Sequence, residues 1–415
     1  MVREDPVNVW VLVLESVVVV HTVLALGFTI VCIVATLVVS VSSRRADREF
    51  GRDDLVALPP VLLLRPAENV DVGGGDRWAS DSVAYSGACT RVVCLPELPS
   101  GPRPDSRALG TMVASGIAPD APVNRKMAHL AAGLAHAEVA GLVTADTVVV
   151  HADADVVLGP GDLDDLIRAL RREASSAMAF AAPRPTGRLA WLARQVIALS
   201  PHAFSVLFAL ARVTGGPPPV AGKLVAVRAD VLAALGGYGR FASDIADDLA
   251  LVEAVHGAGH GIEASVRSVR VDGRDRSLRS FLDQLTRWIR VASSHRKGLR
   301  LLYPTFVAPL GVSTLLVGTL AVAAPSAAGT DVAFGSLAGL VLARTILALT
   351  VALAHHGPDE RRSLLGAPFL AFAGDWVVTV AALRAGVRAP IRWSGRDYEV
   401  ERGGRITGCK VVPGG

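Results

Sequence analysis

Two aspartates one residue apart, Asp153 and Asp155, directly follow a short apolar run at residues 147–151. Mg²⁺ and Mn²⁺ favour carboxylate oxygens, and such ions often bind substrate phosphates at the same time. The pair could therefore link the protein to a diphosphate and neutralise a departing phosphate group. Asp-x-Asp triplets like this one also arise by chance in a chain this rich in Asp. A second copy at 162–164 precedes the helical pattern at 166–172, where acids favour a helix N-terminus, so we expect that copy to cap.

A second acidic cluster contains Asp244, Asp247 and Asp248. Three acids in five residues repel one another, which is unfavourable unless a metal ion or a partner neutralises the charge or catalysis requires a base there. One of these carboxylates could act as the general base that takes a proton from an acceptor hydroxyl. The structural alternative is an acidic first turn of a helix over 249–255.

A third group lies on a predicted helix that contains Gln284, Arg287 and Trp288. Spacings of three and four residues place all three side chains on one helical face. Arg can grip a diphosphate, and Trp can stack on a sugar or anchor at a membrane interface. An ordinary interfacial helix, with Trp and Arg at the level of the lipid headgroups, is the alternative interpretation.

The elements that would position these residues can be predicted from short apolar runs at 61–64, 91–95 and 147–151, which are bounded by Pro or polar residues. A helical pattern at 126–140 precedes the third run. Strands that alternate with helices indicate a parallel, doubly wound sheet, in which ligands bind beyond the carboxyl ends of the strands. The acids that follow the runs, including Glu97 after the second, are therefore the residues expected at the site.

The uncharged segment at 17–41 is long enough to cross a bilayer as a helix. Four arginines follow it (Arg44, Arg45, Arg48 and Arg52), and Arg3 alone precedes it. The positive-inside rule therefore predicts an N-terminus outside and residues from 43 onward in the cytoplasm. A bacterial chain of this kind would be an integral protein of the inner membrane.

Two further apolar segments, 305–325 and 332–355, are predicted to form a transmembrane hairpin. Arg344 lies inside the second, and an intramembrane Arg is expected to face protein or a cavity. The segment at 364–383 contains Pro, Gly and Asp and has arginines on both sides, so we expect it to re-enter the membrane or lie at its surface rather than span it.

Composition agrees with a membrane-bound protein that has one soluble domain. Hydrophobic residues make up 51% of the 415 residues and gather at the two ends. The net charge of +4 is combined with only 5% aromatics, which speaks against nucleic-acid binding. The four cysteines form no CxxC pair, so no zinc or thiol redox motif is predicted.

The order and spacing of these features resemble the ceramide glucosyltransferase branch of the inverting family-2 glycosyltransferases, which includes bacterial hopanoid-associated enzymes. The segments that carry the resemblance are PPVLLLRP at 59–66, NRKMAHL at 124–130, HADAD at 151–155, the segment 219–232, ADD at 246–248, QLTRW at 284–288, GDW at 374–376 and WSGRDY at 393–398. The chain departs from the family pattern at Arg65, where Lys is usual, at Arg125, where Pro is usual, and at Glu97, where the family has an Asp that holds the uridine.

The resemblance implies a GT-A-like α/β domain, a UDP-sugar donor, Mg²⁺ or Mn²⁺, and roles for individual residues. Asp248 would be the general base, and Asp153 and Asp155 would bind the metal. The donor and its diphosphate would be bound by Glu97, Lys126, Asp153, Asp155, Gln284, Arg287 and Trp288. The acceptor side would contain Gly222, Lys223, Asp247 and His202.

These features predict an enzyme that transfers a hexose from a UDP-sugar to the hydroxyl of a ceramide-like membrane lipid, with inversion at the anomeric carbon, as in glycolipid and sphingolipid synthesis. The expected organisation is an anchor (1–42), a cytoplasmic transferase domain (43–300), a transmembrane hairpin (301–358), and an interfacial segment with a basic tail (359–415). A processive polysaccharide synthase and a non-catalytic membrane scaffold that retains the fold are the alternatives.

Overall fold

The computed structural model divides into two compact units, each built from separated stretches of the chain. The sheet unit comprises Val39–Ala190, Ala211–Asp275 and Ala389–Gly415, and the helical unit comprises Met1–Val38, Trp191–Leu210 and Arg276–Arg388. The structure describes residues 6–53, 58–68, 78, 81, 84–98, 110–170, 174–179, 181–184, 204–219, 222–265, 268–272, 278–296, 298–324, 328–355, 367–387 and 389–412.

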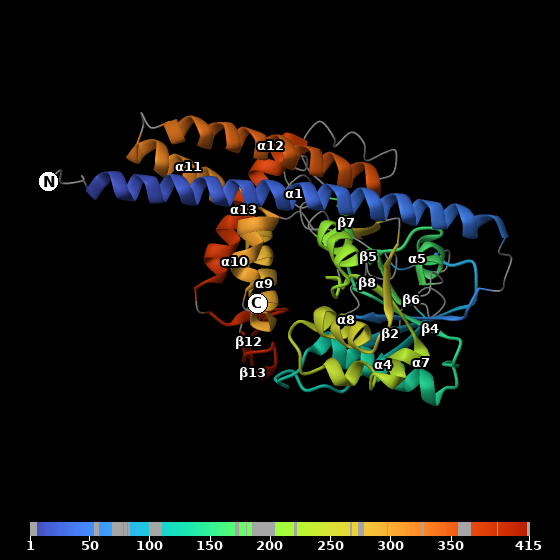
Figure 1. Ribbon diagram of the computed structural model, residues 1–415. Coiled ribbons are helices and arrows are strands. Elements are labelled where there is room, and N and C mark those ends of the chain that lie inside the picture. The colour runs from blue at the N-terminus through green and yellow to red at the C-terminus, as the bar shows by residue number, and fades with distance from the viewer. Residues whose placement is uncertain are drawn as a thin grey trace. The chain divides into compact units, whose positions relative to one another are not determined.

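A seven-stranded mixed sheet, in the order β3-β2-β1-β4-β8-β6-β9, forms the centre of the sheet unit. Figure 1 labels β2, β4, β6 and β8 of this sheet. Its strands are β1 (Val61–Pro66), β2 (Cys89–Leu95), β3 (Thr111–Ala114), β4 (Val148–Ala152), β6 (Ala174–Ala179), β8 (Leu224–Arg228) and β9 (Gly261–Ala264). Every residue of β1 and β4 is buried, which explains why these strands are continuous apolar runs in the sequence.

The predicted parallel arrangement holds for β3, β2, β1 and β4 and not for β8, which is antiparallel to both β4 and β6. A short apolar run carries no signal for the direction of its strand, so the sequence pattern could not distinguish the two cases. Because of this reversal, Leu224 at the start of β8 pairs with Ala152 at the end of β4. The residues that precede β8 therefore lie beside those that follow β4.

The sheet unit also contains helices and a small second sheet. The helices are α4 (Arg125–Val139), α5 (Asp162–Leu170), α7 (Ala229–Ala234) and α8 (Asp247–Gly257), and the second sheet contains β5 (Val156–Val157), β10 (Val269–Asp272) and β7 (Ala181–Arg184) in that order. Asp162 and Asp164 lie in the first turn of α5, as predicted, and Asp162 Oδ2 accepts the Gly159 N–H at 2.7 Å. The second Asp-x-Asp copy is thus a helix-start feature.

The C-terminal residues form a three-stranded antiparallel sheet of β11 (Ile391–Trp393), β12 (Arg396–Val400) and β13 (Ile406–Val411). The Ser-Gly of the WSGRDY motif is the two-residue turn between β11 and β12, with φ of 48° at Ser394 and 70° at Gly395. Two backbone hydrogen bonds join this sheet to the loop before α8: Ile245 N–H to Gly404 O at 2.9 Å, and Ile406 N–H to Ser243 O at 2.7 Å.

The helical unit contains most of α1 (Pro6–Asp53) together with α9 (Leu278–His295), α10 (Leu299–Leu302), a π-helical turn (Tyr303–Val307), α11 (Leu310–Ala323), α12 (Ala328–His355) and α13 (Ala367–Ala385). In the part of the chain that the structure describes, Val9–Ser42 and Thr330–Val351 are long and apolar enough to cross a membrane. The pair Leu299–Val307 and Leu310–Ala323 would supply a third span if it acts as one, although it is bent by 75°. These helices indicate an integral membrane protein.

The bend lies within the segment 305–325, which the sequence predicted as the first span of the hairpin. Pro309 lies at the break and has no N–H with which to continue the preceding helix, which is a common cause of such kinks. The helix α13, at the segment expected to re-enter or lie at the interface, is not among the candidate spans.

Arg344 faces protein, as predicted, because its guanidinium is 2.7 Å from Asp375 Oδ1 on α13. The other carboxylate oxygen of Asp375 accepts the Leu310 N–H at 3.1 Å, at the first turn of α11. Asp375 is only 1% exposed, so a single buried carboxylate joins α11, α12 and α13.

Candidate active site

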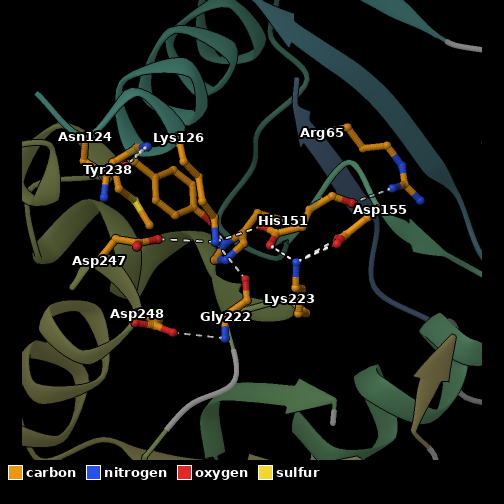
Figure 2. Close-up of polar contacts among 12 residues, drawn as sticks. Arg65, Asn124, Lys126, His151, Asp155, Gly222, Lys223, Tyr238, Asp247 and Asp248 are labelled. Atoms are coloured by element: carbon orange, nitrogen blue, oxygen red, sulfur yellow. Dashed lines mark hydrogen bonds and ion pairs between the residues drawn. The ribbon is translucent and has the colours of Figure 1, made fainter. Parts of the chain in front are cut away.

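The candidate active site lies in the sheet unit, beyond the end of β4, where a turn carries Asp153 and Asp155 (Figure 2). Lys223, which directly precedes β8, reaches both carboxylates. Its Nζ lies 3.0 Å from Asp153 Oδ2, and 2.9 and 2.8 Å from the two oxygens of Asp155. The antiparallel direction of β8 makes this contact possible, and the Asp153 N–H also donates to Lys223 O at 2.9 Å.

Lys126, in the first turn of α4, connects the two acidic motifs. Its Nζ lies 2.9 Å from Asp153 Oδ1 and 3.3 Å from Asp247 Oδ2, and it donates to Gly222 O at 2.7 Å. Burial alone would lower the pKa of Lys126, but the surrounding carboxylates outweigh it and raise the pKa above its usual range. Burial would likewise raise the pKa of Asp153, but Lys126 and Lys223 hold it below its usual range. Both groups are therefore charged at neutral pH.

Asp248 lies in the first turn of α8 beside this cluster and is held by backbone groups. Its Oδ1 accepts the Leu249 N–H at 3.0 Å, and its Oδ2 accepts the Gly222 N–H at 3.2 Å. Burial, together with the negative charge of Asp247, raises the pKa of Asp248 to about 6, while Lys126 opposes the rise. A carboxyl group with a pKa near neutrality can accept a proton and release it again, as a general base must.

Gly222 is required at its position by close packing. A Cβ there would lie 2.8 Å from the Asp248 Cβ and 3.0 Å from its Oδ2. The residue therefore supplies an N–H to Asp248 and a carbonyl to Lys126 at a separation that no side chain allows.

A pair of buried side chains that the sequence pattern did not reveal lies under the cluster. The ring of His151, which is 1% exposed, contacts the Tyr238 hydroxyl through Nδ1 at 3.1 Å. Burial, followed by the charge of Lys126, lowers the pKa of His151 to about 3. His151 is thus neutral at pH 7 and serves to support the end of β4.

A second feature that sequence reasoning missed is a brace behind the Asp153–Asp155 turn, formed by Arg65, Asp81 and Trp78. The Arg65 guanidinium pairs with both oxygens of Asp81, at 2.6 and 2.7 Å, and lies 5.5 Å from the centre of the Trp78 ring. It also donates to Asp153 O at 3.2 Å and to Val156 O at 3.0 Å, the carbonyls on either side of the turn. The RP ending of the first apolar run was the only signal of this brace.

The start of α4 is tied to the loop that leads to Asp247 and Asp248. Asn124, the N-cap of α4, donates from its backbone to Ala242 O at 2.7 Å and from Nδ2 to Asp244 O at 2.9 Å. The loop is held on its other side by the C-terminal sheet. These contacts position Lys126 and Asp247 relative to each other.

The remaining predicted residues fall elsewhere. Glu97 is exposed directly after the end of β2, as its place in the sequence predicted, and its role in donor binding stays a prediction. Gln284, Arg287 and Trp288 lie on α9 in the helical unit, so their roles also stay predictions. His202 lies outside the described residues.

The residues around Asp153 fit a divalent cation that shares its coordination with a substrate. Within the described ranges there is no group of three or more His, Cys, Asp or Glu that could hold a metal by itself. Mg²⁺, however, usually takes only one or two carboxylates from a protein and completes its coordination with water and phosphate oxygens. Asp153 and Asp155 supply that number.

Many solved structures are similar to this chain, and two of them are mycobacterial proteins. The crystal structure of a mycobacterial protein is 17% identical, with 57% of this chain and 74% of that chain covered and a TM-score of 0.33. Glucosyl-3-phosphoglycerate synthase from Mycobacterium tuberculosis, solved with Mn²⁺, UDP and phosphoglyceric acid, is 20% identical, covers 57% of this chain and 78% of its own, and has a TM-score of 0.32. TM-scores this low support no conclusion about the fold or the function of this chain. No curated protein matches the sequence.

Residues 113–406 match glycosyl transferase family 21, a range that includes β4, β8, α8 and α9. The matched range extends over well more than half of the chain, and it contains both acidic motifs and both lysines that the site brings together. The mixed sheet is accordingly of the GT-A-like type, and the chain belongs to glycosyl transferase family 21, whose members transfer a sugar from a nucleotide-sugar donor.

Proposed function

We propose that this enzyme transfers a hexose from a UDP-sugar to the hydroxyl group of a membrane lipid, with inversion at the anomeric carbon. The observation that carries the proposal is the placement of Asp248. It is a carboxylate with a pKa of about 6, fixed by two backbone N–H groups and connected through Gly222 and Lys126 to the charged cluster of Asp153, Asp155 and Lys223.

Asp248 acts as the general base. It accepts the proton of the lipid hydroxyl as that oxygen forms a bond to the anomeric carbon of the sugar. The bond from the anomeric carbon to the diphosphate oxygen breaks at the same time, and UDP leaves with the electron pair. At pH 7 most Asp248 side chains are ionised, because this pH lies above the pKa of about 6.

The donor diphosphate binds on the other side of the cluster. Lys126 and Lys223 present two ammonium groups there, which attract the negative charge that develops on the departing UDP. Asp153 and Asp155 would hold Mg²⁺ or Mn²⁺, which when bound supplies further positive charge to that diphosphate. Gln284, Arg287 and Trp288 are proposed to contact the leaving group, and Glu97 the uridine.

The lipid acceptor is supported by the membrane character of the chain, in which two or three helices are candidate spans. The arginines that follow the first apolar segment favour a cytoplasmic location of the transferase domain. Gly222, Asp247 and His202 are proposed for the acceptor side. Lys223, which the family resemblance placed there, is instead proposed to act on the donor diphosphate, because its ammonium contacts Asp153 and Asp155.

The test is transfer by the detergent-purified full-length protein, supplied with Mn²⁺, radiolabelled UDP-sugars and a total lipid extract. We expect a labelled lipid, and we expect Asp248→Asn to abolish it. Asp230→Asn is the matched control, because Asp230 also opens a helix but its side chain is 43% exposed. Transfer that survives Asp248→Asn would exclude Asp248 as the base. A labelled polymer would favour a processive synthase, and no product with any donor would favour the scaffold.

A further inference from the structure

Every carboxylate oxygen of the Asp153–Asp155 pair has an ammonium group close to it. Asp153 Oδ1 is 2.9 Å from Lys126 Nζ, and Asp153 Oδ2 is 3.0 Å from Lys223 Nζ. Both oxygens of Asp155 lie within 2.9 Å of the same Lys223 Nζ. Lys223 thus contacts both of the carboxylates that would hold a divalent cation.

The main chain of Lys223 is fixed, whereas its ammonium can move. The carbonyl of Lys223 accepts the Asp153 N–H at 2.9 Å, and the next residue, Leu224, pairs with Ala152 across the sheet. The side chain is 25% exposed and has a flexible four-carbon stem. Lys126 has less freedom, because it is only 12% exposed and also contacts Asp247 and Gly222 O.

The position of the Lys223 ammonium restricts what can bind this pair. It lies within 3.0 Å of both carboxylates, so a free divalent cation would have to displace it or lie against it, and the displaced ammonium would gain no new anionic partner. The diphosphate of a nucleotide sugar brings two negative charges. It therefore balances a divalent cation and offers Lys223 a new anionic partner.

We propose that Lys223 is an internal counter-ion that keeps a free divalent cation off the Asp153–Asp155 pair until the donor diphosphate draws the ammonium away. This inference rests on the proposed use of a UDP-sugar. Its consequence is positive coupling: UDP strengthens metal binding, and metal strengthens UDP binding by the same factor.

The test is Mn²⁺ binding to the full-length protein in detergent, measured from the electron paramagnetic resonance signal of free Mn²⁺ with and without UDP, after subtraction of the Mn²⁺ that UDP binds in the same buffer without protein. The wild type should bind Mn²⁺ weakly alone and at least about tenfold more tightly with UDP. Lys223→Met should bind Mn²⁺ at least about tenfold more tightly than the wild type without UDP, because a repelling charge is gone. The increase in Mn²⁺ affinity that UDP causes should be smaller in Lys223→Met than in the wild type.

Three controls sharpen the result. Lys410→Met removes an ammonium that pairs with Glu399 and is 77% exposed, and it should bind Mn²⁺ like the wild type. Lys223→Arg keeps the positive charge and should remain a weak Mn²⁺ binder. Asp155→Asn in the Lys223→Met background should remove the added affinity.

Equal Mn²⁺ affinity of the wild type with and without UDP would overturn the inference, and this measurement needs no variant to fold. A Lys223→Met protein that melts like the wild type and binds Mn²⁺ no more tightly would overturn it as well. Sugar transfer by the wild type, assayed in parallel, separates the two proposals. Tight Mn²⁺ binding by Lys223→Met, combined with no sugar transfer by the wild type, would contradict the proposed function alone. Sugar transfer by the wild type, combined with unchanged Mn²⁺ affinity in Lys223→Met, would contradict the inference alone.

Discussion

The brace formed by Arg65 and Asp81 offers a sharp test of how the site is supported. Arg65 is 2% exposed and makes two hydrogen bonds to Asp81 and two to the carbonyls of Asp153 and Val156. Arg65→Met keeps an apolar side chain of similar length and removes the charge and all four hydrogen bonds. The Asp81 side chain, only 3% exposed, then remains in the interior without its counter-charge.

The expected cost follows from that uncompensated charge. Removing one partner of a buried ion pair destabilises a protein by about 3–5 kcal/mol, whereas replacing both partners by apolar residues is often neutral. Arg65→Met should therefore cost about 3–5 kcal/mol, and Arg65→Met with Asp81→Leu clearly less than the sum of the single changes. For a unit of 150–250 residues, each kcal/mol corresponds to about 2–4 °C in Tm, so the single variant should melt about 6–20 °C lower.

The assay is thermal unfolding of the detergent-purified protein, with Arg228→Met as the matched control. Arg228 pairs with Asp230 at the surface and is 50% exposed, so its loss should change the stability by less than about 1 kcal/mol. Arg65→Lys should keep most of the stability but lose the fork that reaches both carbonyls, and we expect its KM for the UDP-sugar to rise. Strictly additive effects of Arg65→Met and Asp81→Leu would refute the brace.

Three further predictions concern the base and the helical unit. Asp247→Asn removes a negative charge that raises the pKa of Asp248, so the acid limb of the kcat/KM profile should move below pH 6; an unchanged limb would count against the base assignment. Gly222→Ala should lower kcat about 100-fold with little loss of Tm, because a new Cβ displaces the base; near-normal kcat would contradict the packing argument. Asp375→Ala leaves Arg344 unpaired and should lower the stability by about 3–5 kcal/mol in a thermal melt, and an unchanged melting curve would contradict its linking role.

The sequence predicted those parts of the site that depend on local pattern. The runs at 61–64 and 147–151 became β1 and β4 because strands buried on both faces are continuously apolar. The acids of α5 could be assigned to a helix start because the helical pattern follows them directly. In the same way, the acidic cluster at 243–248 leads into the helix that begins at Asp247.

Long-range pairing was outside the reach of such patterns. The contact of Lys223 with Asp153 depends on the direction of β8, which a five-residue apolar run does not encode. Asp81 lies in a stretch rich in Gly, Ser and Asp that has no periodicity, so its partnership with Arg65 could not be inferred. The family resemblance gave Lys223 an acceptor-side role, whereas its observed partners are the acids expected to bind the donor.

The strands β11, β12 and β13 are synthesised after α13, yet they belong to the sheet unit, most of which precedes the apolar helices of the second half of the chain. Gly404 and Ile406 form the backbone hydrogen bonds that hold the loop before α8, and they leave the ribosome only after α13. Domains fold as units while the chain is being made, so this loop lacks its partner strands until the described helices up to α13 have been synthesised. A nascent chain that stops before residue 389 therefore has both acidic motifs but lacks the sheet whose two hydrogen bonds hold the loop before α8.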